Sequence, residues 1–292
     1  MDKELGIVCE GGGMRGIYVS GVLDELLLRG IVSDGLVGVS AGIIHGISYV
    51  SDQCGRNIRY TLKYRGNKRF MSWSSFFKTG NVCETEFCYE EIPNKLSKFD
   101  YDTFRERAEH IKTYSVVTSL ETGKAEYIRL HDLKTQMDAV RASASLPLIS
   151  ENVEYNGKYY LDGGTADSIP LGFMVEHGFK KNIVILTRPE GYVKKPDSTM
   201  PILQAKYKDY PAYVEACRDR HIMYNDELRL VDRLEKEGRI FVIRPSRSIK
   251  VGRAESDVNK IKRMYKLGRF DAMNALNSDK AVDFLGDFQG DI

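Results

Sequence analysis

Cysteine and histidine are both scarce in this chain of 292 residues, which contains five of each. An odd number of cysteines does not complete a disulfide framework, and free thiols are typical of a reducing compartment. Cys83 and Cys88 lie five positions apart, with no second pair and no cluster of histidines near them. This spacing gives no pattern for a metal site. We therefore expect free thiols and no bound metal.

Long apolar runs are also absent. The longest stretch without Asp, Glu, Lys or Arg covers residues 35–51, and it holds four glycines, three serines and His45. Such a segment is too polar for a helix that crosses a membrane. The first residues, MDKELGIVCEGGG, reach glycines too early for a signal peptide. We expect a cytoplasmic protein, and contact with the inner face of a membrane stays open.

The chain has little net charge, because 43 Lys and Arg oppose 41 Asp and Glu and leave +2. No overall field attracts nucleic acid, so we expect no such partner. Hydrophobic residues make up 42%, which is typical of a folded protein with a substantial core. Composition leaves the oligomeric state open.

Periodicity predicts an α/β fold. Residues 5–9 and 35–39 are short apolar strands, and glycines and a helix follow each of them. This order so early in the chain implies a parallel sheet. Asn156-Gly157 predicts a two-residue hairpin turn. Other expected strands cover 113–120, 125–130, 182–187 and 239–245, and other expected helices cover 134–144, 203–237 and 255–277.

The glycine-rich segment GGGMRG, residues 11–16, admits two interpretations. It satisfies G-x-G-x-x-G between a strand and a helix, as in dinucleotide-binding folds. Those folds place an acidic residue at the end of the second strand, whereas Asp34 lies before that strand. Alternatively, the N–H groups of Gly11, Gly12 and Gly13 form an anion cradle at a helix N-terminus. For a tetrahedral intermediate this cradle would be an oxyanion hole, and the misplaced aspartate favours it.

A serine follows the second predicted strand in the pattern G-x-S-x-G, residues 38–42. A serine exposed on a sharp turn between strand and helix is strained, and side chains two positions away do not fit. Gly38 and Gly42 meet that requirement, and Ala41 keeps the start of the helix open. Ser40 is therefore a candidate nucleophile at the sheet edge that carries the glycine loop. Plain packing glycines would give the same pattern.

A nucleophilic serine needs a base, and no histidine is distinctive enough for this role. His45 follows Ser40 by five residues on the same predicted helix, so we expect it to point well away. His177 suits the end of a helix, and His221 lies in a charged helical run. Asp162 ends a predicted strand before two glycines. It is a candidate base or orienting partner, although an aspartate there can simply form the turn.

Three separated motifs together resemble the patatin-like phospholipase family. They are GGGMRG at 11–16, GVSAG at 38–42 and DGG at 162–164, in the order of that family. RASASLPLI at 141–149 is similar to the family's segment before the last motif. The resemblance covers about residues 5–190, and no motif position departs from the family pattern.

The resemblance implies a three-layer α/β/α sandwich around a mostly parallel sheet. It also implies a lipid acyl hydrolase that acts on fatty acyl esters without metal, cofactor or catalytic histidine. Ser40 would be the nucleophile, Asp162 would accept its proton, and the loop 11–13 would bind the oxyanion. Burial would raise the pKa of the aspartate towards the range a base needs. The supporting motif positions are Arg15, Gly16, Gly38, Ala41, Gly42, Gly163 and Gly164. A catalytically idle protein that binds a lipid or a partner is the alternative.

We place a patatin-like catalytic domain at 1–190, with a helical insertion at 52–110. A helical segment with one further strand, 191–292, is expected to pack on the same domain after the candidate linker 188–198. The insertion carries too many large apolar residues for an exposed loop. They either pack in a core or form a wall or lid of the acyl site, and they are Phe70, Met71, Trp73, Phe76 and Phe77.

Basic residues are concentrated near the end of the chain. Residues 244–269 contain nine Lys or Arg and two acidic residues, a local net charge of +7 in a chain of +2. Lys260, Arg263 and Lys266 can share one face of a helix. That face is either merely solvated or attracts anionic phospholipid. RNA binding is a third possibility, but no aromatic platform accompanies these charges.

Overall fold

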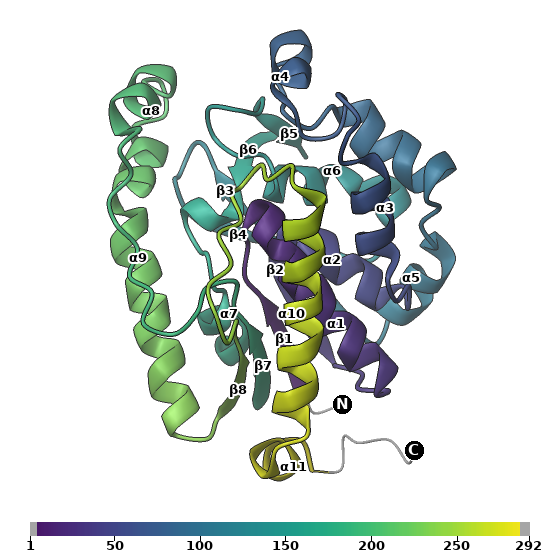
Figure 1. The fold of residues 1–292 in the computed structure, drawn as a ribbon. Helices are drawn as coiled ribbons and strands as arrows, with labels where there is room; N and C mark the ends of the chain where they lie inside the picture. Colours follow the sequence, from purple (N-terminus) through teal and green to yellow (C-terminus); the bar gives the residue numbers. More distant parts are fainter. Residues whose placement is uncertain (1–4, 287–292) are drawn as a thin grey trace.

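Two short apolar strands followed by glycine turns form the centre of the molecule, as their sequences predict. The computed structural model describes residues 5–286 and contains one eight-stranded sheet. Its order is β5-β6-β3-β2-β1-β7-β8, and β4 also pairs with β3. Neighbouring strands among β3, β2, β1, β7 and β8 are parallel, whereas β4, β5 and β6 pair antiparallel. The sheet is mostly parallel, with helices on both faces, which confirms the predicted three-layer fold (Figure 1).

Residues 1–4, at the start of the predicted catalytic domain 1–190, lie outside the described chain, as do residues 287–292, at the end of the predicted segment 191–292. The strands are β1 Leu5–Cys9, β2 Gly35–Val39, β3 Lys112–Ser119, β4 Ala125–Leu130, β5 Val153–Tyr155, β6 Lys158–Asp162, β7 Lys181–Ile185 and β8 Ile240–Ile243. The helices are η1 Gly13–Gly16, α1 Ile17–Leu28, α2 Ala41–Val50, α3 Arg56–Tyr64, α4 Trp73–Thr79, η2 Glu86–Leu96, α5 Tyr101–Ala108, α6 Leu133–Ser143, η3 Gly163–Thr165, α7 Leu171–Glu176, α8 Met200–Lys206, α9 Pro211–Lys236, α10 Val258–Leu276 and α11 Asp279–Leu285.

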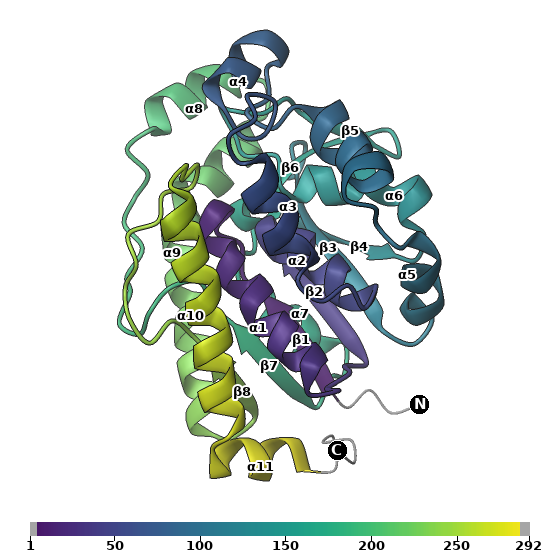
Figure 2. The same cartoon turned by 45° about the vertical axis from the view of Figure 1, so that its right-hand side comes forward.

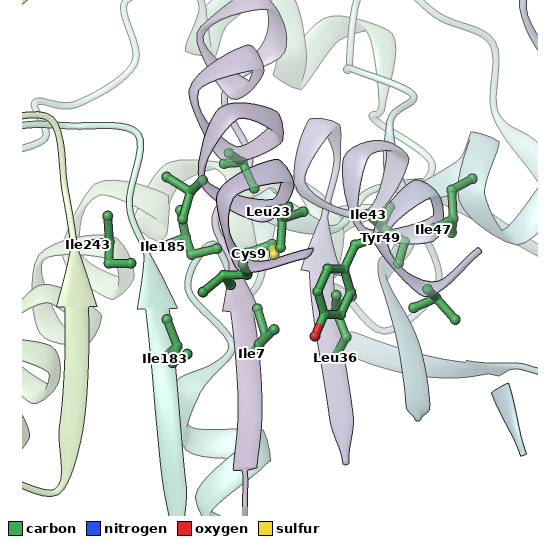
Figure 3. Close-up of a cluster of buried hydrophobic side chains, with 14 of the residues drawn as sticks. Ile7, Cys9, Leu23, Leu36, Ile43, Ile47, Tyr49, Ile183, Ile185 and Ile243 are labelled. Carbon is green, nitrogen blue, oxygen red and sulfur yellow. The ribbon is translucent and has the colours of Figure 1, made fainter. Parts of the chain in front are cut away.

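Both faces of the central strands are apolar because successive side chains point to opposite sides of a sheet. Ile7 and Ile183 face the layer that contains α1 and α2, and Figure 3 shows them below Leu23 of α1. The next residues along these strands, Val8 and Val184, pack against α7 and α9. Full burial of such a side chain contributes about 1.5–3 kcal/mol. The two apolar cores hold the central strands from both sides.

The C-terminal helix α10 packs closely along α1 (Figures 1 and 2). A Cβ atom on Gly268 would lie 2.2 Å from the Tyr18 carbonyl oxygen, and one on Gly21 would lie 2.4 Å from that of Tyr265. These glycines let the two backbones approach, and the Tyr18 hydroxyl donates to Asp271 Oδ2 at 3.1 Å. Since β8 also pairs with β7, residues 240–276 share the layers of the segments that carry the three predicted motifs.

The predicted helix over 203–237 is wrong in one respect, because two helices, α8 and α9, occupy this range. Pro211 begins α9. A proline has no N–H to continue a helix and disfavours helical geometry in the preceding residue. Accordingly, Tyr210 has φ −124° and ψ 68°. Tyr207 ends the shorter helix in a buried apolar cluster, which fixes the break.

The candidate linker 188–198 connects β7 to α8, after which the chain returns to the same sheet through β8. The insertion 52–110 consists of helices and loops, as predicted. Its helix α4 and the separate helix α8 lie at the end of the molecule opposite α11 (Figures 1 and 2). The predicted hairpin also forms, with positive φ at Asn156 and Gly157.

Candidate active site

Ser40 lies between the last residue of β2 and the first residue of α2, with φ 55° and ψ −123°. A positive φ is costly for a residue with a side chain, by about 1–3 kcal/mol. The surrounding residues hold this conformation: the Ser40 N–H donates to Ser143 Oγ at 2.9 Å. A Cβ atom on Gly42 would lie 2.3 Å from the Cys9 carbonyl oxygen, so only glycine fits there. The strained turn projects the serine from the sheet edge.

The other predicted positions around this turn are equally crowded. A Cβ atom on Gly38 would lie 2.6 Å from the backbone nitrogen of Ile43. One on Gly16 would lie 2.4 Å from the Cβ atom of Ala41, which brings the end of the glycine loop against the first turn of α2. These contacts support the steric interpretation of the two motifs.

The glycine loop lies directly against Ser40. A Cβ atom on Gly11 would lie 3.0 Å from the Ser40 Cβ and 2.9 Å from the Val39 carbonyl oxygen. The backbone N–H groups of Gly11, Gly12 and Gly13 donate no hydrogen bond to any residue within 5–286. Three N–H donors without a partner, on the loop that contacts Ser40, are available to a negative oxygen.

The pairing of β2 and β6 with one strand, β3, places Asp162 near Ser40. Asp162 pairs with Val117 and Val39 pairs with Val116, and β4 covers the opposite edge of β3 at both positions. The ends of β2 and β6 therefore meet on one edge of β3. A Cβ atom on Gly163 would lie 2.1 Å from the Val116 carbonyl oxygen, which explains the glycine after the aspartate.

The Asp162 carboxyl group is buried and has one firm hydrogen bond. Its Oδ1 accepts the Gly164 N–H at 2.9 Å, and its Oδ2 has no hydrogen-bond partner among the described residues. Burial raises the pKa of Asp162. The nearby Ser40 hydroxyl and the positive charge of Arg220 oppose that increase in pKa without cancelling it. The aspartate is therefore a stronger base than an exposed one.

The histidines of the described chain are not bonded to the serine or the aspartate. His45 lines an apolar cavity that Ser40 also lines, and burial lowers the pKa of His45 to about 4. His177 at the end of α7 bonds to the Phe173 carbonyl, and His221 on α9 bonds to that of Arg218. Within residues 5–286, no histidine is hydrogen-bonded to Ser40 or Asp162.

Two cavities meet at the serine. Ser40, Gly13 and Leu146 line both of them. The apolar cavity extends between α2, α3, η2 and α6, and its other walls include Ile44, Tyr60, Phe70, Met71, Ile92 and Val140. The other walls of the polar cavity include Glu10, Arg15, Asp162, Arg188, Lys194, Arg220, Tyr224 and Arg253.

The predicted aromatic wall is only partly present. Phe70 and Met71 line the apolar cavity. Trp73 and Phe77 do not, because they lie on α4 with 61% and 82% of their surface exposed. The insertion thus supplies both a cavity wall and an exposed aromatic tip.

Arg15 lies in the polar cavity, where its Nε is buried without a hydrogen-bond partner in the described chain. Burial lowers its pKa to about 10. The neighbouring Glu10 at the end of β1 accepts hydrogen bonds from the Tyr224 hydroxyl and the Thr187 N–H. This network joins the glycine loop to α9. Sequence patterns did not indicate Tyr224, Arg188, Lys194 or Arg220, since they lie far apart in the chain without a motif. Arg253 was indicated only as part of the basic stretch 244–269 and not as a neighbour of Ser40.

The predicted basic face on α10 is partly neutralised. Lys260 forms an ion pair with Glu255 at 3.2 Å, whereas Arg263 and Lys266 are exposed and form no ion pair within the described chain. Arg253, from the same basic stretch, instead borders the polar cavity. Local net charge alone therefore overstates the free positive surface.

Two absences concern the described residues only. None of the helices within 5–286 is long and apolar enough to span a bilayer. The same residues contain no group of three His, Cys, Asp or Glu side chains arranged to hold a metal ion. The five cysteines are free thiols.

Fold and site together define a class of α/β proteins with a serine on a strained turn, a glycine loop and a buried aspartate. A family model described as patatin-like phospholipase matches residues 7–175, which is more than half of the chain. The protein belongs to the patatin-like phospholipase family. A second model, described as a domain of unknown function (DUF6363), matches residues 210–282.

Several known proteins are similar to this chain. YjjU of Escherichia coli, described as uncharacterized, is 26% identical over 278 residues, which cover 91% of this chain and 75% of YjjU. The probable lipid hydrolase 463L of Invertebrate iridescent virus 6 is 25% identical over 60% of this chain and 65% of its own length. The lysophospholipase NTE1 of Candida albicans is 27% identical over 63% of this chain but only 13% of its own length. The crystal structure of VipD from Legionella pneumophila gives a TM-score of 0.43 at 12% identity and covers 95% of this chain and 67% of VipD.

Proposed function

We propose that this protein is a lipid acyl hydrolase that cleaves fatty acyl esters. One observation carries the proposal: Ser40 lies beside three free N–H groups and a buried aspartate, on the wall of an apolar cavity. An apolar cavity next to a nucleophile suits an acyl chain, because each buried CH₂ group contributes about 0.8 kcal/mol. Family membership and the lipid hydrolases among the relatives support the same class of reaction.

In the proposed reaction, Ser40 Oγ attacks the ester carbonyl carbon while Asp162 accepts the hydroxyl proton. The N–H groups of Gly11, Gly12 and Gly13 stabilise the negative oxygen of the tetrahedral intermediate. Asp162 then gives its proton to the departing alcohol, which leaves the acyl group on Ser40. Water, deprotonated by Asp162, attacks the carbonyl carbon of this acyl-serine. Asp162 returns the proton to Ser40 Oγ as the bond between Oγ and the carbonyl carbon breaks, which releases the carboxylic acid and restores the free enzyme. No histidine is required, because the buried aspartate has a raised pKa.

A catalytically idle binding protein is the alternative, and covalent labelling distinguishes it. We expect a fluorophosphonate probe to form an adduct on the peptide that contains Ser40, because phosphonylation follows the same attack on an electrophile. Ser40→Ala should abolish the adduct, and Asp162→Asn should slow labelling by at least a hundredfold. Absence of an adduct on any serine of the folded protein would contradict hydrolysis and leave the binding protein as the explanation.

A further inference from the structure

The polar cavity beside Ser40 is strongly cationic. Five basic side chains and two carboxyl groups line it. The basic residues come from η1, the loop after β7, α9 and the loop before α10, and they are Arg15, Arg188, Lys194, Arg220 and Arg253. The carboxyl groups are those of Glu10 and Asp162.

Carboxylates offset this positive charge only in part: Glu10 attracts Lys194, and Asp162 and Asp197 attract Arg253. Within residues 5–286, none of Arg188, Lys194, Arg220 and Arg253 forms an ion pair, although basic residues elsewhere do, as in Arg269–Glu25 at 2.8 Å. Arg188 and Lys194 instead lie over the rings of Tyr192 and Tyr224, at 4.3 and 4.4 Å from the ring centroids. Such contacts orient a cation without cancelling its charge.

The basic residues destabilise one another's protonated forms. The pKa of Lys194 falls to about 7, because burial disfavours its charge and Arg220 and Arg253 repel it. Burial and repulsion by Arg220 also lower the pKa of Arg253. An anion bound among these side chains would relieve both effects, since an opposite charge stabilises the protonated forms. The cavity is therefore built for a negative group.

We propose that Arg188, Lys194, Arg220 and Arg253 form a subsite for a phosphate group, which belongs to the headgroup of a phospholipid substrate. The assignment of this phosphate to a phospholipid headgroup rests on the proposed function, whereas the phosphate subsite itself does not. Ser40 lies where the polar and apolar cavities meet. A lipid with its ester at Ser40 therefore places the acyl chain in the apolar cavity and its phosphate among the cations. Guanidinium groups suit this role because their donors match phosphate oxygens.

All four residues lie outside the part of the chain that matches the patatin-like family model, residues 7–175. Arg220 and Arg253 fall within residues 210–282, the match to a domain of unknown function. In this protein, that segment closes the active site and selects the substrate by its headgroup. The loop before α10, which carries Arg253, also supports the oxyanion cradle, since the Arg253 carbonyl accepts the Met14 N–H at 3.0 Å.

Direct binding tests the phosphate subsite without any need for hydrolysis. We would titrate the full chain carrying Ser40→Ala with sn-glycerol 3-phosphate and with inorganic phosphate in a calorimeter at low salt. Adding Arg188→Gln and Lys194→Gln should weaken both affinities at least tenfold. Arg247→Gln, which removes an exposed arginine outside this cavity, should leave them unchanged. No binding of either anion, or equal affinity with and without the two cavity substitutions, would overturn the subsite.

Kinetics test the headgroup assignment. We would compare kcat/KM for dihexanoyl phosphatidylglycerol with that for monohexanoylglycerol. Arg188→Gln with Lys194→Gln should lower the ratio at least tenfold, mainly through KM, and Arg247→Gln should preserve it. If anion binding is lost while the ratio stays constant, the cations hold a free phosphate and the headgroup assignment is wrong. If the anions bind but wild-type protein hydrolyses neither ester, the proposed function fails and the phosphate subsite stands.

Discussion

Gly164 holds only one of the two oxygens of Asp162: its N–H donates to Oδ1 at 2.9 Å, and Oδ2 is buried without a hydrogen-bond partner in the described chain. In the proposed reaction, this asymmetry has a chemical use. The hydrogen bond to Oδ1 fixes the carboxyl group against the sheet edge. Because no N–H group of the described chain is hydrogen-bonded to Oδ2, that oxygen can accept a proton without losing a hydrogen bond. Burial already raises the pKa of this group, so protonation during the reaction costs less than it would for an exposed aspartate.

We predict that Ser40→Ala and Asp162→Asn each lower kcat for a soluble ester by about 10⁴-fold or more, and that the double variant loses little further activity. Each substitution alone already removes most of the activity, because the two residues act as one catalytic unit. His177→Ala and His221→Ala should each stay within about tenfold of wild type. Steady-state kinetics with circular dichroism as a folding control checks this. A folded histidine variant as inactive as Ser40→Ala would replace the dyad by a triad.

The pH profile of kcat/KM should report the same group. A base works only when deprotonated, so activity should rise with pH through the raised pKa of Asp162. The midpoint of this acid limb should therefore lie above the ordinary aspartate value of about 3.9. Profiles of wild type and of Arg220→Gln check the cause, because removal of a nearby positive charge should move the midpoint further up. A midpoint at or below 3.9 would contradict Asp162 as the base.

We predict that filling the apolar cavity shortens the acyl chains that the protein accepts. Ala144 lines this cavity, and Ala144→Leu should lower kcat/KM for a dodecanoyl ester at least tenfold and for a butyryl ester less than twofold. Ala216→Leu on α9 adds the same volume at a position outside both cavities and is the matched control. Equal losses for both chain lengths would show that the acyl chain binds elsewhere.

The exposed tip of α4 should contact lipid surfaces. Trp73 and Phe77 are 61% and 82% exposed, and α4 lies opposite α11 (Figure 1). Trp73→Ser with Phe77→Ser should weaken binding to phospholipid vesicles about tenfold in a sedimentation assay and change hydrolysis of a dissolved ester less than twofold. Val282→Ser removes an apolar group that is 54% exposed on α11 and should not change vesicle binding. Equal binding by all variants would remove α4 from the contact.

A half-buried carboxyl pair, Asp167 and Glu227, should make stability depend on pH. Burial raises the pKa of both groups, so the folded state binds protons more tightly than the unfolded state. Their stabilising effect is complete below the unfolded pKa values near ~4 and is lost as pH rises through the folded values. Asp167→Asn keeps an acceptor for the Tyr127 hydroxyl, which donates to Asp167 Oδ2 at 2.6 Å. The variant's Tm should exceed that of wild type at pH 8 by a few degrees, and this gain should vanish near pH 4. Exposed Asp209→Asn is the control, and a gain independent of pH would contradict the linkage.

We predict that α10 belongs to one cooperative unit with the catalytic motifs. Gly268→Ala places a Cβ atom 2.2 Å from the Tyr18 carbonyl oxygen, and such overpacking costs about 1–3 kcal/mol. Gly172→Ala on α7 meets no atom within 4 Å and should be neutral or stabilising. Thermal unfolding followed by circular dichroism and by esterase activity should show one lower transition for Gly268→Ala. Two transitions, with activity lost only at the higher one, would make α10 a separate unit.

Sequence patterns predicted the parts of the site that depend on local sterics. The glycines on either side of Ser40 mark positions at which no side chain fits. Short apolar strands next to these glycines indicate where the turn lies. The approach of Asp162 depends on strand register along β3, which periodicity does not specify; the order of the family motifs indicated it instead. Arg188 and Lys194 carried no functional signal, and Arg253 was indicated only as part of the basic stretch 244–269, because only the tertiary fold brings their segments to one cavity. Local charge counts likewise missed the ion pair that neutralises Lys260.

The bond from Met14 N–H to the Arg253 carbonyl has a consequence for protein synthesis. Translation proceeds from the N-terminus, so the glycine loop, Ser40 and Asp162 leave the ribosome well before Arg253. Until then the glycine loop lacks the backbone contact that fixes it, and the cavity lacks one of its cations. A nascent chain is thus deprived of a fully formed site while it is being made.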